Sequence, residues 1–159
     1  MPMPRIHLTT FIQSPPQRVF DLCRHLSLIK KSVLGKHESI ISSAGSTMVT
    51  NGDTITFHAK HLGKMRSVML RITEFDKDHK LTEEQVKGDL INYRHEHYFK
   101  QIDNGTIMID IVEYDLPKDF IGKWAGKFFL REYLEKIIKN RILVIKNYAE
   151  TERWHALLG

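Results

Sequence analysis

Two histidines lie two residues apart in a segment of alternating apolar and polar side chains, residues 92–102. Because successive side chains of a β-strand point to opposite faces, His95 and His97 share one face of the strand that this alternation predicts. Imidazole groups on the inner face of a sheet transfer protons, orient ligands or bind metal ions. The residues that face them therefore decide which chemistry the sequence favours.

The segment that follows the histidines alternates in the same way and predicts a partner strand over residues 106–114. Between the two strands, Asp103-Asn104-Gly105 suits a three-residue hairpin loop with glycine in the left-handed conformation. That loop places His95 opposite Glu113. The mostly apolar face that results is expected to line a cavity, and it holds Tyr93, His95, His97, Phe99, Ile107, Ile109, Ile111 and Glu113. The opposite face is expected to meet water, and it holds Arg94, Glu96, Tyr98, Lys100 and Asp110.

An inward His95 beside Glu113 predicts a hydrogen-bonded acid–base pair in a partly dry pocket. Such a pair positions a ligand, closes one end of the core, or transfers protons in catalysis. We favour the structural and ligand-positioning roles, and we keep His95 and Glu113 as the candidate catalytic residues. The pairing depends on the loop type, because a shift of one residue turns every side chain of one strand to the other face.

Metal binding needs a third ligand beside the two histidines, and Glu113 is the nearest candidate in this register. No segment matches the spacing of a recognised zinc motif, a phosphate-binding loop or a nucleophile elbow. The single cysteine, Cys23, lies in an apolar helical pattern that predicts a buried structural role. The sequence therefore predicts neither a metal ion nor a cofactor.

An arginine lies in the middle of the apolar stripe of a helix predicted over residues 130–148. Arg141 follows Ile137 by one turn on this stripe, and a guanidinium on a buried face needs an anionic partner. That partner is Glu113 or another strand carboxylate, which we favour, or the carboxylate of a ligand. At the start of the same helical stretch, Trp124 and Phe128 predict an aromatic wall of the pocket, although such spacing is also common in a plain core.

Strand patterns fill the chain between two short N-terminal helices and the long C-terminal helix. A strand over residues 6–12 precedes the short helices, which begin at Ser14-Pro15-Pro16 and continue to residue 34. Turn sequences join six further strands, over residues 38–43, 53–61, 66–75, 81–87, 92–102 and 106–114. Short turns imply an antiparallel sheet, and one long helix covers only one face of it. A pocket is therefore expected between sheet and helix.

The composition of the chain excludes several classes of function. The 159 residues suit a single domain, and 42% hydrophobic and 27% charged residues are typical of a folded globular protein. The net charge of +5 is spread along the chain without a run of five basic residues, so it favours a solvated surface over nucleic-acid binding. The apolar runs are too short for a membrane span and the N-terminus lacks a signal-peptide pattern, so we expect a cytoplasmic protein.

Three motifs, which together span four segments, resemble the SRPBCC superfamily, which includes START lipid-transfer domains, birch-pollen-allergen-like proteins and polyketide cyclases. Residues 11–22, FIQSPPQRVFDL, look like its opening strand and helix, and residues 110–117, DIVEYDLP, look like the approach to its last helix. Residues 84–88, EQVKG, and 93–99, YRHEHYF, are similar to the signature of a ligand-binding branch. Asp89 replaces the proline usual after this glycine, and Tyr93 stands where tryptophan is common. The resemblance implies one α+β helix-grip domain over residues 1–159, with a curved antiparallel sheet of six to seven strands wrapped on a long C-terminal helix.

The resemblance and the residue pattern together predict a protein that binds a small lipophilic or amphipathic molecule. The expected ligand-binding residues are Tyr93, His95, His97, Phe99, Ile109, Ile111, Glu113, Trp124, Phe128, Ile137 and Arg141. The alternative is a cyclase- or dehydratase-like enzyme that uses the His95–Glu113 pair, and a protein-interaction role is a third hypothesis. We expect no nucleic-acid partner and no integral membrane contact, and a homodimer stays an open alternative.

Overall fold

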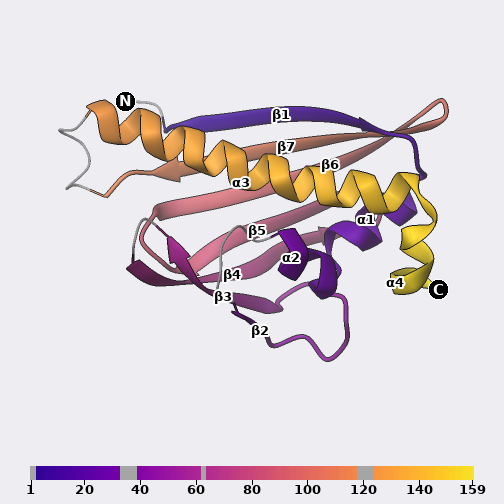
Figure 1. Ribbon diagram of the computed structural model, residues 1–159, viewed down its shortest axis with the longest axis horizontal. Helices are drawn as coiled ribbons and strands as arrows, with labels where there is room; N and C mark the ends of the chain where they lie inside the picture. Colours follow the sequence, from indigo (N-terminus) through magenta and orange to yellow (C-terminus); the bar gives the residue numbers. More distant parts are fainter. Residues whose placement is uncertain (1–2, 33–38, 62–63, 118–123) are drawn as a thin grey trace.

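The chain forms one curved antiparallel sheet that is crossed by a long helix (Figure 1). The computed structural model describes residues 3–32, 39–61, 64–117 and 124–159, with all their side chains except those of residues 61 and 124–127. In chain order the elements are β1 Arg5–Ile12, α1 Pro16–Cys23, α2 Leu26–Ser32, β2 Ser39–Ser42, β3 Thr54–His61, β4 Lys64–Asp76, β5 Lys80–Lys87, β6 Ile91–Ile102, β7 Gly105–Asp115, α3 Trp124–Glu150, the 3-10 helix η2 Glu152–Trp154 and α4 His155–Leu158. The predicted helix-grip architecture is confirmed.

The seven strands pair in the order β1-β7-β6-β5-β4-β3-β2, so the N-terminal strand joins the sheet beside the last one. Alternating side chains give the sheet one buried face, as in β7, where the buried positions are every second residue. Register shifts interrupt the β4–β5 ladder at two points and the β6–β7 ladder near Ile91. Such irregularities bend and twist strands, which curves the sheet around the helix.

Helix α3 lies along the open side of the curved sheet, and α1 and α2 pack beside it (Figure 1). Its buried residues recur with helical spacing, at Ile138, Ile142, Ile145 and Ala149. Near its C-terminal end the helix also contacts strand β1. Lys146 Nζ donates to the Phe11 carbonyl at 2.7 Å, and the Gln13 amide donates to Glu150 Oε2 at 2.8 Å. The helix is thereby fastened to one edge of the sheet.

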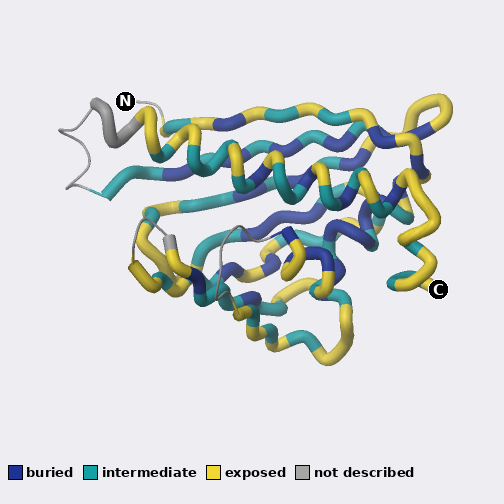
Figure 2. The backbone as a smooth tube through the Cα atoms, in the orientation of Figure 1, coloured by how far each residue is buried: buried dark blue, intermediate teal, exposed yellow. Residues whose placement is uncertain are grey.

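The apolar core fills one end of the space between the sheet and the helices. Phe20 of α1 is fully buried, and its ring makes edge-on contacts with Phe75 and Phe99 at centroid distances of 5.3 Å. Figure 2 shows buried stretches along the strands, whereas the tip of the β6–β7 hairpin is exposed. Among the described helices, none is both long and apolar enough to cross a bilayer.

The β6–β7 hairpin has a different loop from the one that the sequence predicts. Only Asp103 and Asn104 form the loop, Ile102 pairs with Gly105, and Asn104 takes the left-handed conformation with φ 64°. A Cβ atom on Gly105 would lie 2.4 Å from the Ile12 carbonyl oxygen, so the glycine is needed for close approach of β1.

This loop shifts the register of β7 by one residue and reverses its faces. His95 lies opposite Val112, and the predicted pairing of His95 with Glu113 is wrong. Ile109, Ile111 and Glu113 lie on the outer face, where Glu113 pairs with Arg5 at 3.7 Å. Asp110, which was expected to meet water, is instead buried on the inner face with 1% exposure.

Candidate functional site

A cavity of about 240 Å³ lies between the sheet and helix α3. Its apolar lining residues are Ile29, Phe57, Val68, Leu70, Leu90, Pro117, Leu130, Leu134, Ile137 and Ile138. Its polar lining residues are Ser32, Arg66, Glu83, Gln85, Asp89, Tyr93, Tyr133, His95 and Arg141. Arg66 and Asp89 form an ion pair between partly exposed side chains, whereas Glu83 and His95 are almost fully buried. The cavity therefore joins an apolar wall to a buried polar region.

The buried polar region begins with an ion pair between β5 and α3. Arg141 donates through Nη1 to Glu83 Oε2 at 3.0 Å and through Nη2 to Glu83 Oε1 at 2.7 Å. Nη2 also donates to the Cys23 carbonyl at 3.0 Å, at the end of α1. Burial opposes ionisation of Glu83, but Arg141 outweighs it and holds the pKa of that carboxyl well below its usual range. The pair is therefore charged and bidentate, and it connects three elements.

A second carboxylate, Asp110, lies between the two histidines of β6. Its Oδ1 atom is 2.8 Å from His95 Nε2 and 2.8 Å from His97 Nδ1. The contact with His95 is a hydrogen bond, whereas the contact with His97 is close but not aligned as one. The His95 and His97 rings lie against each other with centroids 3.8 Å apart. One oxygen atom thus orients both imidazoles.

The two histidines differ in charge. Burial and the neighbouring His97 lower the pKa of His95 to about 4, so His95 is neutral near pH 7. Burial also disfavours charge on His97, but its contacts with Cys23, Asp110 and Glu83 raise its pKa well above the usual value. With Glu83 and Asp110 ionised and Arg141 and His97 cationic, the buried network is electrically balanced. Burial raises the pKa of Tyr93, which keeps its phenol neutral at the cavity wall.

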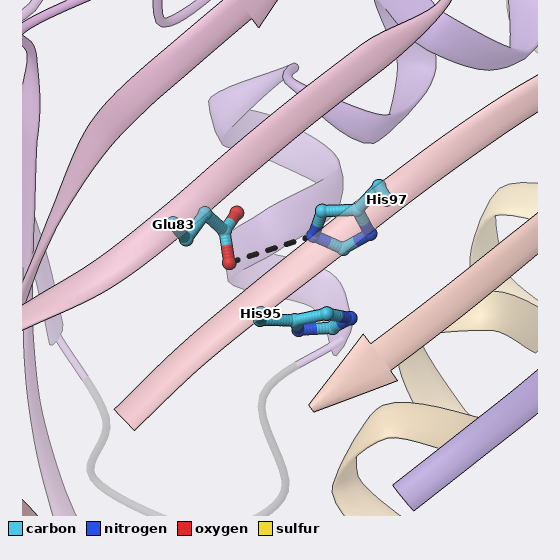
Figure 3. Close-up of side chains that lie close together, drawn as sticks. All are labelled: Glu83, His95 and His97. Carbon is cyan, nitrogen blue, oxygen red and sulfur yellow. Dashed lines mark ion pairs between the residues drawn. The ribbon is translucent and has the colours of Figure 1, made fainter. Parts of the chain in front are cut away.

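Glu83, His95 and His97 are also close enough to share a metal ion. One donor atom from each side chain lies within 4.8 Å of the other two. Figure 3 shows the Glu83 carboxylate directed at His97, with His95 beside it. The sequence prediction of no metal considered Glu113 as the third ligand, and the structure brings Glu83 there instead.

Only some of the predicted ligand-binding residues reach the cavity. Tyr93, His95, Ile137 and Arg141 line it. His97 is 0% exposed and lies behind His95, and Phe99 belongs to the core against Phe20. Ligand contact by these lining residues stays a prediction.

The remaining predicted residues whose side chains the structure describes lie away from the cavity. Phe128 is 64% exposed on α3, and the side chain of Trp124 lies outside the described residues. Ile109, Ile111 and Glu113 are on the far face of the sheet because of the register shift. The predicted face was correct for β6 but wrong for β7.

Sequence reasoning missed the two buried carboxylates, Glu83 and Asp110. A signal existed for Glu83, because it alternates with Leu81 on the inner face of β5 and pairs with His95 in the β5–β6 ladder. Asp110 was placed on the outer face by the wrong loop. The need of Arg141 for a strand carboxylate was predicted, and that carboxylate is Glu83.

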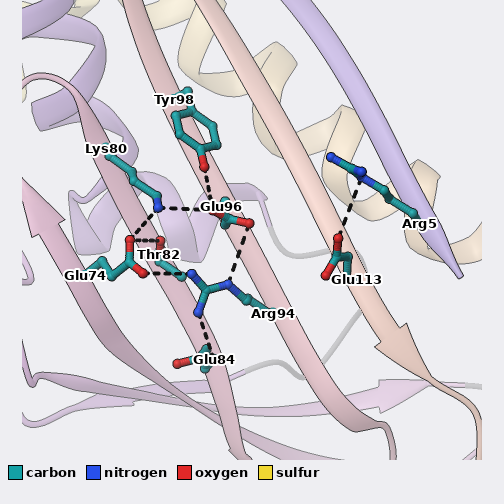
Figure 4. A network of polar contacts seen from close by, with 9 residues as sticks. All are labelled: Arg5, Glu74, Lys80, Thr82, Glu84, Arg94, Glu96, Tyr98 and Glu113. Atoms are coloured by element: carbon teal, nitrogen blue, oxygen red, sulfur yellow. Dashed lines mark hydrogen bonds and ion pairs between the residues drawn. The ribbon is translucent and has the colours of Figure 1, made fainter. Parts of the chain in front are cut away.

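The outer face of the same strands carries a separate charge cluster (Figure 4). Glu74 binds Lys80 at 2.5 Å and Arg94 at 2.7 Å, and the cluster continues through Glu84, Glu96 and Tyr98. These hydrogen bonds with Lys80 and Arg94 lower the pKa of Glu74 to about 2. This cluster lies on the opposite face of the sheet from the cavity.

Comparison with known proteins gives similarity in structure only. No family model matches the chain, and no curated protein sequence matches it. A protein from Thermus thermophilus has 21% identity and a TM-score of 0.66, over 98% of this chain and 100% of that one. A major latex-like protein from Panax ginseng has 9% identity and a TM-score of 0.68, over 95% and 100%. The di-domain ARO/CYC StfQ of the steffimycin biosynthetic pathway has 12% identity and a TM-score of 0.75, over 94% of this chain and 52% of that one.

At these identities the likeness concerns the fold. The ginseng protein and StfQ are both helix-grip proteins, and their strand and helix arrangement matches that of this chain over almost its whole length. The three local motifs quoted from the sequence agree with this arrangement. The chain therefore has a helix-grip fold.

Proposed function

We propose that the protein binds a small amphipathic molecule whose apolar body fills the cavity and whose neutral polar group meets the buried network. The observation that carries this proposal is the cavity itself, which has ten apolar lining residues and a group of buried polar residues. Burial of apolar ligand surface provides about 25 cal/mol per Å² of binding free energy. A few fixed polar groups then provide orientation.

The charge balance of the network favours a hydroxyl or carbonyl group over a carboxylate. Arg141 donates through both Nη atoms to Glu83 and through Nη2 also to the Cys23 carbonyl, so the guanidinium keeps no adjacent pair of free N–H groups for a ligand carboxylate. Only its buried Nε lacks a partner among the described residues. A ligand carboxylate beside Glu83 would add an uncompensated buried charge, which is costly. The neutral phenol of Tyr93 and the imidazole of His95 suit a neutral polar group.

The first experiment is native mass spectrometry of the purified protein, followed by titration with 1-decanol monitored by displacement of an uncharged, polarity-sensitive fluorescent dye. Leu134→Trp adds bulk at the cavity wall and is expected to weaken 1-decanol binding at least tenfold. Leu143→Trp makes the same change on the exposed face of α3, where Leu143 is 62% exposed, and is expected to leave binding unchanged. Equal affinities in both variants, or no binding by the wild-type protein, would contradict the proposal.

A second candidate function is proton transfer on a bound carbonyl compound, as in the cyclase alternative. It is favoured by the hydrogen bond of His95 Nε2 to Asp110 at 2.8 Å, which orients a neutral imidazole at the cavity wall. In this mechanism the carboxylate partner of His95 is Asp110 instead of Glu113, which the sequence predicted. The test is deuterium exchange at the α-carbon of 2,4-decanedione in D₂O. Faster exchange with the wild-type protein than with His95→Phe would support catalysis, and equal rates would leave binding as the function.

A further inference from the structure

We propose that Glu83, His95 and His97 form a binding site for one divalent transition-metal ion at the buried end of the cavity. Strand pairing fixes the backbone positions of the three residues, because Glu83 is paired with His95 across β5 and β6 and His97 follows on the same face. All three residues are 0–2% exposed. Two imidazoles and one carboxylate are the donor set of the facial metal sites of proteins, and they favour Fe²⁺, Co²⁺ or Zn²⁺ over Ca²⁺ and Mg²⁺.

The ring nitrogens are arranged as metal-ligating histidines require. In metal sites the nitrogen that does not bind the ion is held by a carboxylate or carbonyl oxygen. Here Asp110 Oδ1 lies 2.8 Å from His95 Nε2 and 2.8 Å from His97 Nδ1. Both nitrogens of His97 are buried without an aligned hydrogen bond among the described residues, and Nε2, the one away from Asp110, lies 3.6 Å from Glu83 Oε2. Asp110 is thus positioned to orient both rings toward the carboxylate of β5.

The distances leave room for an ion after a small adjustment. The donor atoms lie within 4.8 Å of one another. An ion at about 2.1 Å from each donor needs donor separations of roughly 3–3.5 Å, so the widest pair of donors must close by at most about 1–2 Å. Rotation about side-chain bonds provides this movement without a change in strand pairing.

The contacts of Glu83 and His95 also determine how an ion reaches the site and which group competes with it. Glu83 and His95 line the cavity, so a bound ion would keep a coordination position toward the cavity for water or an organic ligand. Arg141 competes for Glu83, because it occupies both carboxylate oxygens. Metal binding would therefore require Glu83 to give one oxygen to the ion while the other stays with Arg141, and it would release the proton of the cationic His97 ring. This makes Arg141 a positioning residue that limits affinity for the metal.

The test uses the full chain after treatment with a chelator, without any organic ligand. Titration with Co²⁺ is expected to give one equivalent of binding with visible d–d absorption of nitrogen and oxygen coordination. Glu83→Gln and His97→Asn are expected to weaken binding by more than about 100-fold. His7→Gln changes an exposed histidine of β1 and is expected to leave the titration unchanged. Absence of one-equivalent binding, or the same affinity in Glu83→Gln and the wild-type protein, would overturn the site.

A second measurement covers the case in which Glu83→Gln or His97→Asn does not fold. Zn²⁺ is expected to raise the unfolding temperature of the wild-type protein, and to raise that of Arg141→Met by more, because removal of the guanidinium frees the carboxylate for the ion. His7→Gln should respond to Zn²⁺ as the wild-type protein does. If Zn²⁺ stabilises neither the wild-type protein nor Arg141→Met, the three side chains form a structural network only and the proposal fails.

Discussion

Arg141 of α3 and Glu83 of β5 form a bidentate ion pair, with nitrogen–oxygen distances of 3.0 and 2.7 Å, inside the space between helix and sheet. The Glu83 side chain is 1% exposed and that of Arg141 is 13% exposed. Two opposite charges so placed hold the helix at a fixed rotation over the sheet. Loss of either partner leaves the other charge buried and unpaired.

Arg141→Met is therefore expected to lower the free energy of unfolding by about 3–5 kcal/mol, because the buried carboxylate of Glu83 loses its arginine partner. The double variant Glu83→Gln/Arg141→Met removes both charges and should recover much of this loss. Lys136→Met makes a similar change on the exposed face of α3 and should alter stability by no more than about 0.5 kcal/mol. Urea unfolding followed by circular dichroism measures all three, and an Arg141→Met variant as stable as the wild-type protein would contradict the expectation.

The tight contact of Gly105 with β1 leads to a second prediction. In Gly105→Ala the new Cβ would lie 2.4 Å from the Ile12 carbonyl oxygen and 2.7 Å from the Phe11 ring, so strand β7 or β1 must move. The expected cost is about 1–3 kcal/mol of stability. Gly45→Ala is the matched control, because apart from its chain neighbours no heavy atom of the described residues lies within 4 Å of its Cβ position. Thermal unfolding of the two variants should separate them clearly, and equal melting temperatures would argue against this packing.

The outer charge cluster predicts a dependence of stability on pH. Lys80 and Arg94 lower the pKa of Glu74 to about 2, below its value in the unfolded chain, so its contribution is complete above about pH 4.5 and is lost as the pH falls toward 2. Since the Glu74 side chain is 41% exposed, solvent screening limits this contribution to at most about 1 kcal/mol. Glu74→Gln should therefore be less stable than the wild-type protein at pH 6 and equally stable near pH 2.

The control for this comparison is Glu132→Gln, a change at an exposed glutamate of α3 that makes no ion pair with the described residues. Its stability difference from the wild-type protein should stay the same across the pH range. Urea unfolding at several pH values gives both differences. A Glu74→Gln deficit that persists near pH 2 would show that the ion pairs are not its cause.

The charge-balanced network also predicts which ligands bind. In metal-free protein at pH 8, 1-decanol and methyl decanoate are expected to bind at least tenfold more tightly than decanoate, because only decanoate brings a charge beside Glu83. The three compounds share an apolar chain, so the comparison isolates the polar group. Probe displacement measures the affinities, and tighter binding of decanoate would mean that Arg141 releases Glu83 to meet the ligand.

The fold could be predicted because its signals are local. Alternation within each strand, turn residues between the strands and the apolar stripe around Ile138 and Ile145 are each visible within a dozen residues. The resemblance to helix-grip proteins rested on the same local segments.

The site was predicted only in part because it depends on contacts between distant segments. Asp103-Asn104-Gly105 suits a two-residue loop with Asn104 in the left-handed conformation as well as a three-residue loop. The contact that accompanies the shorter loop, Gly105 against Ile12, involves the N-terminal strand. One wrong loop placed Glu113 inside and Asp110 outside, and so misassigned the partner of His95.

Fastening of α3 to the end of β1 has a consequence for behaviour at high concentration. Strand β1 is an edge of the sheet, and edge strands offer unpaired main-chain groups to strands of other molecules. Lys146 donates a hydrogen bond to the Phe11 carbonyl, and Glu150 accepts one from the amide of Gln13 just beyond the strand. The C-terminal helix thereby blocks intermolecular β-sheet extension at this end of the edge strand, and so disfavours aggregation.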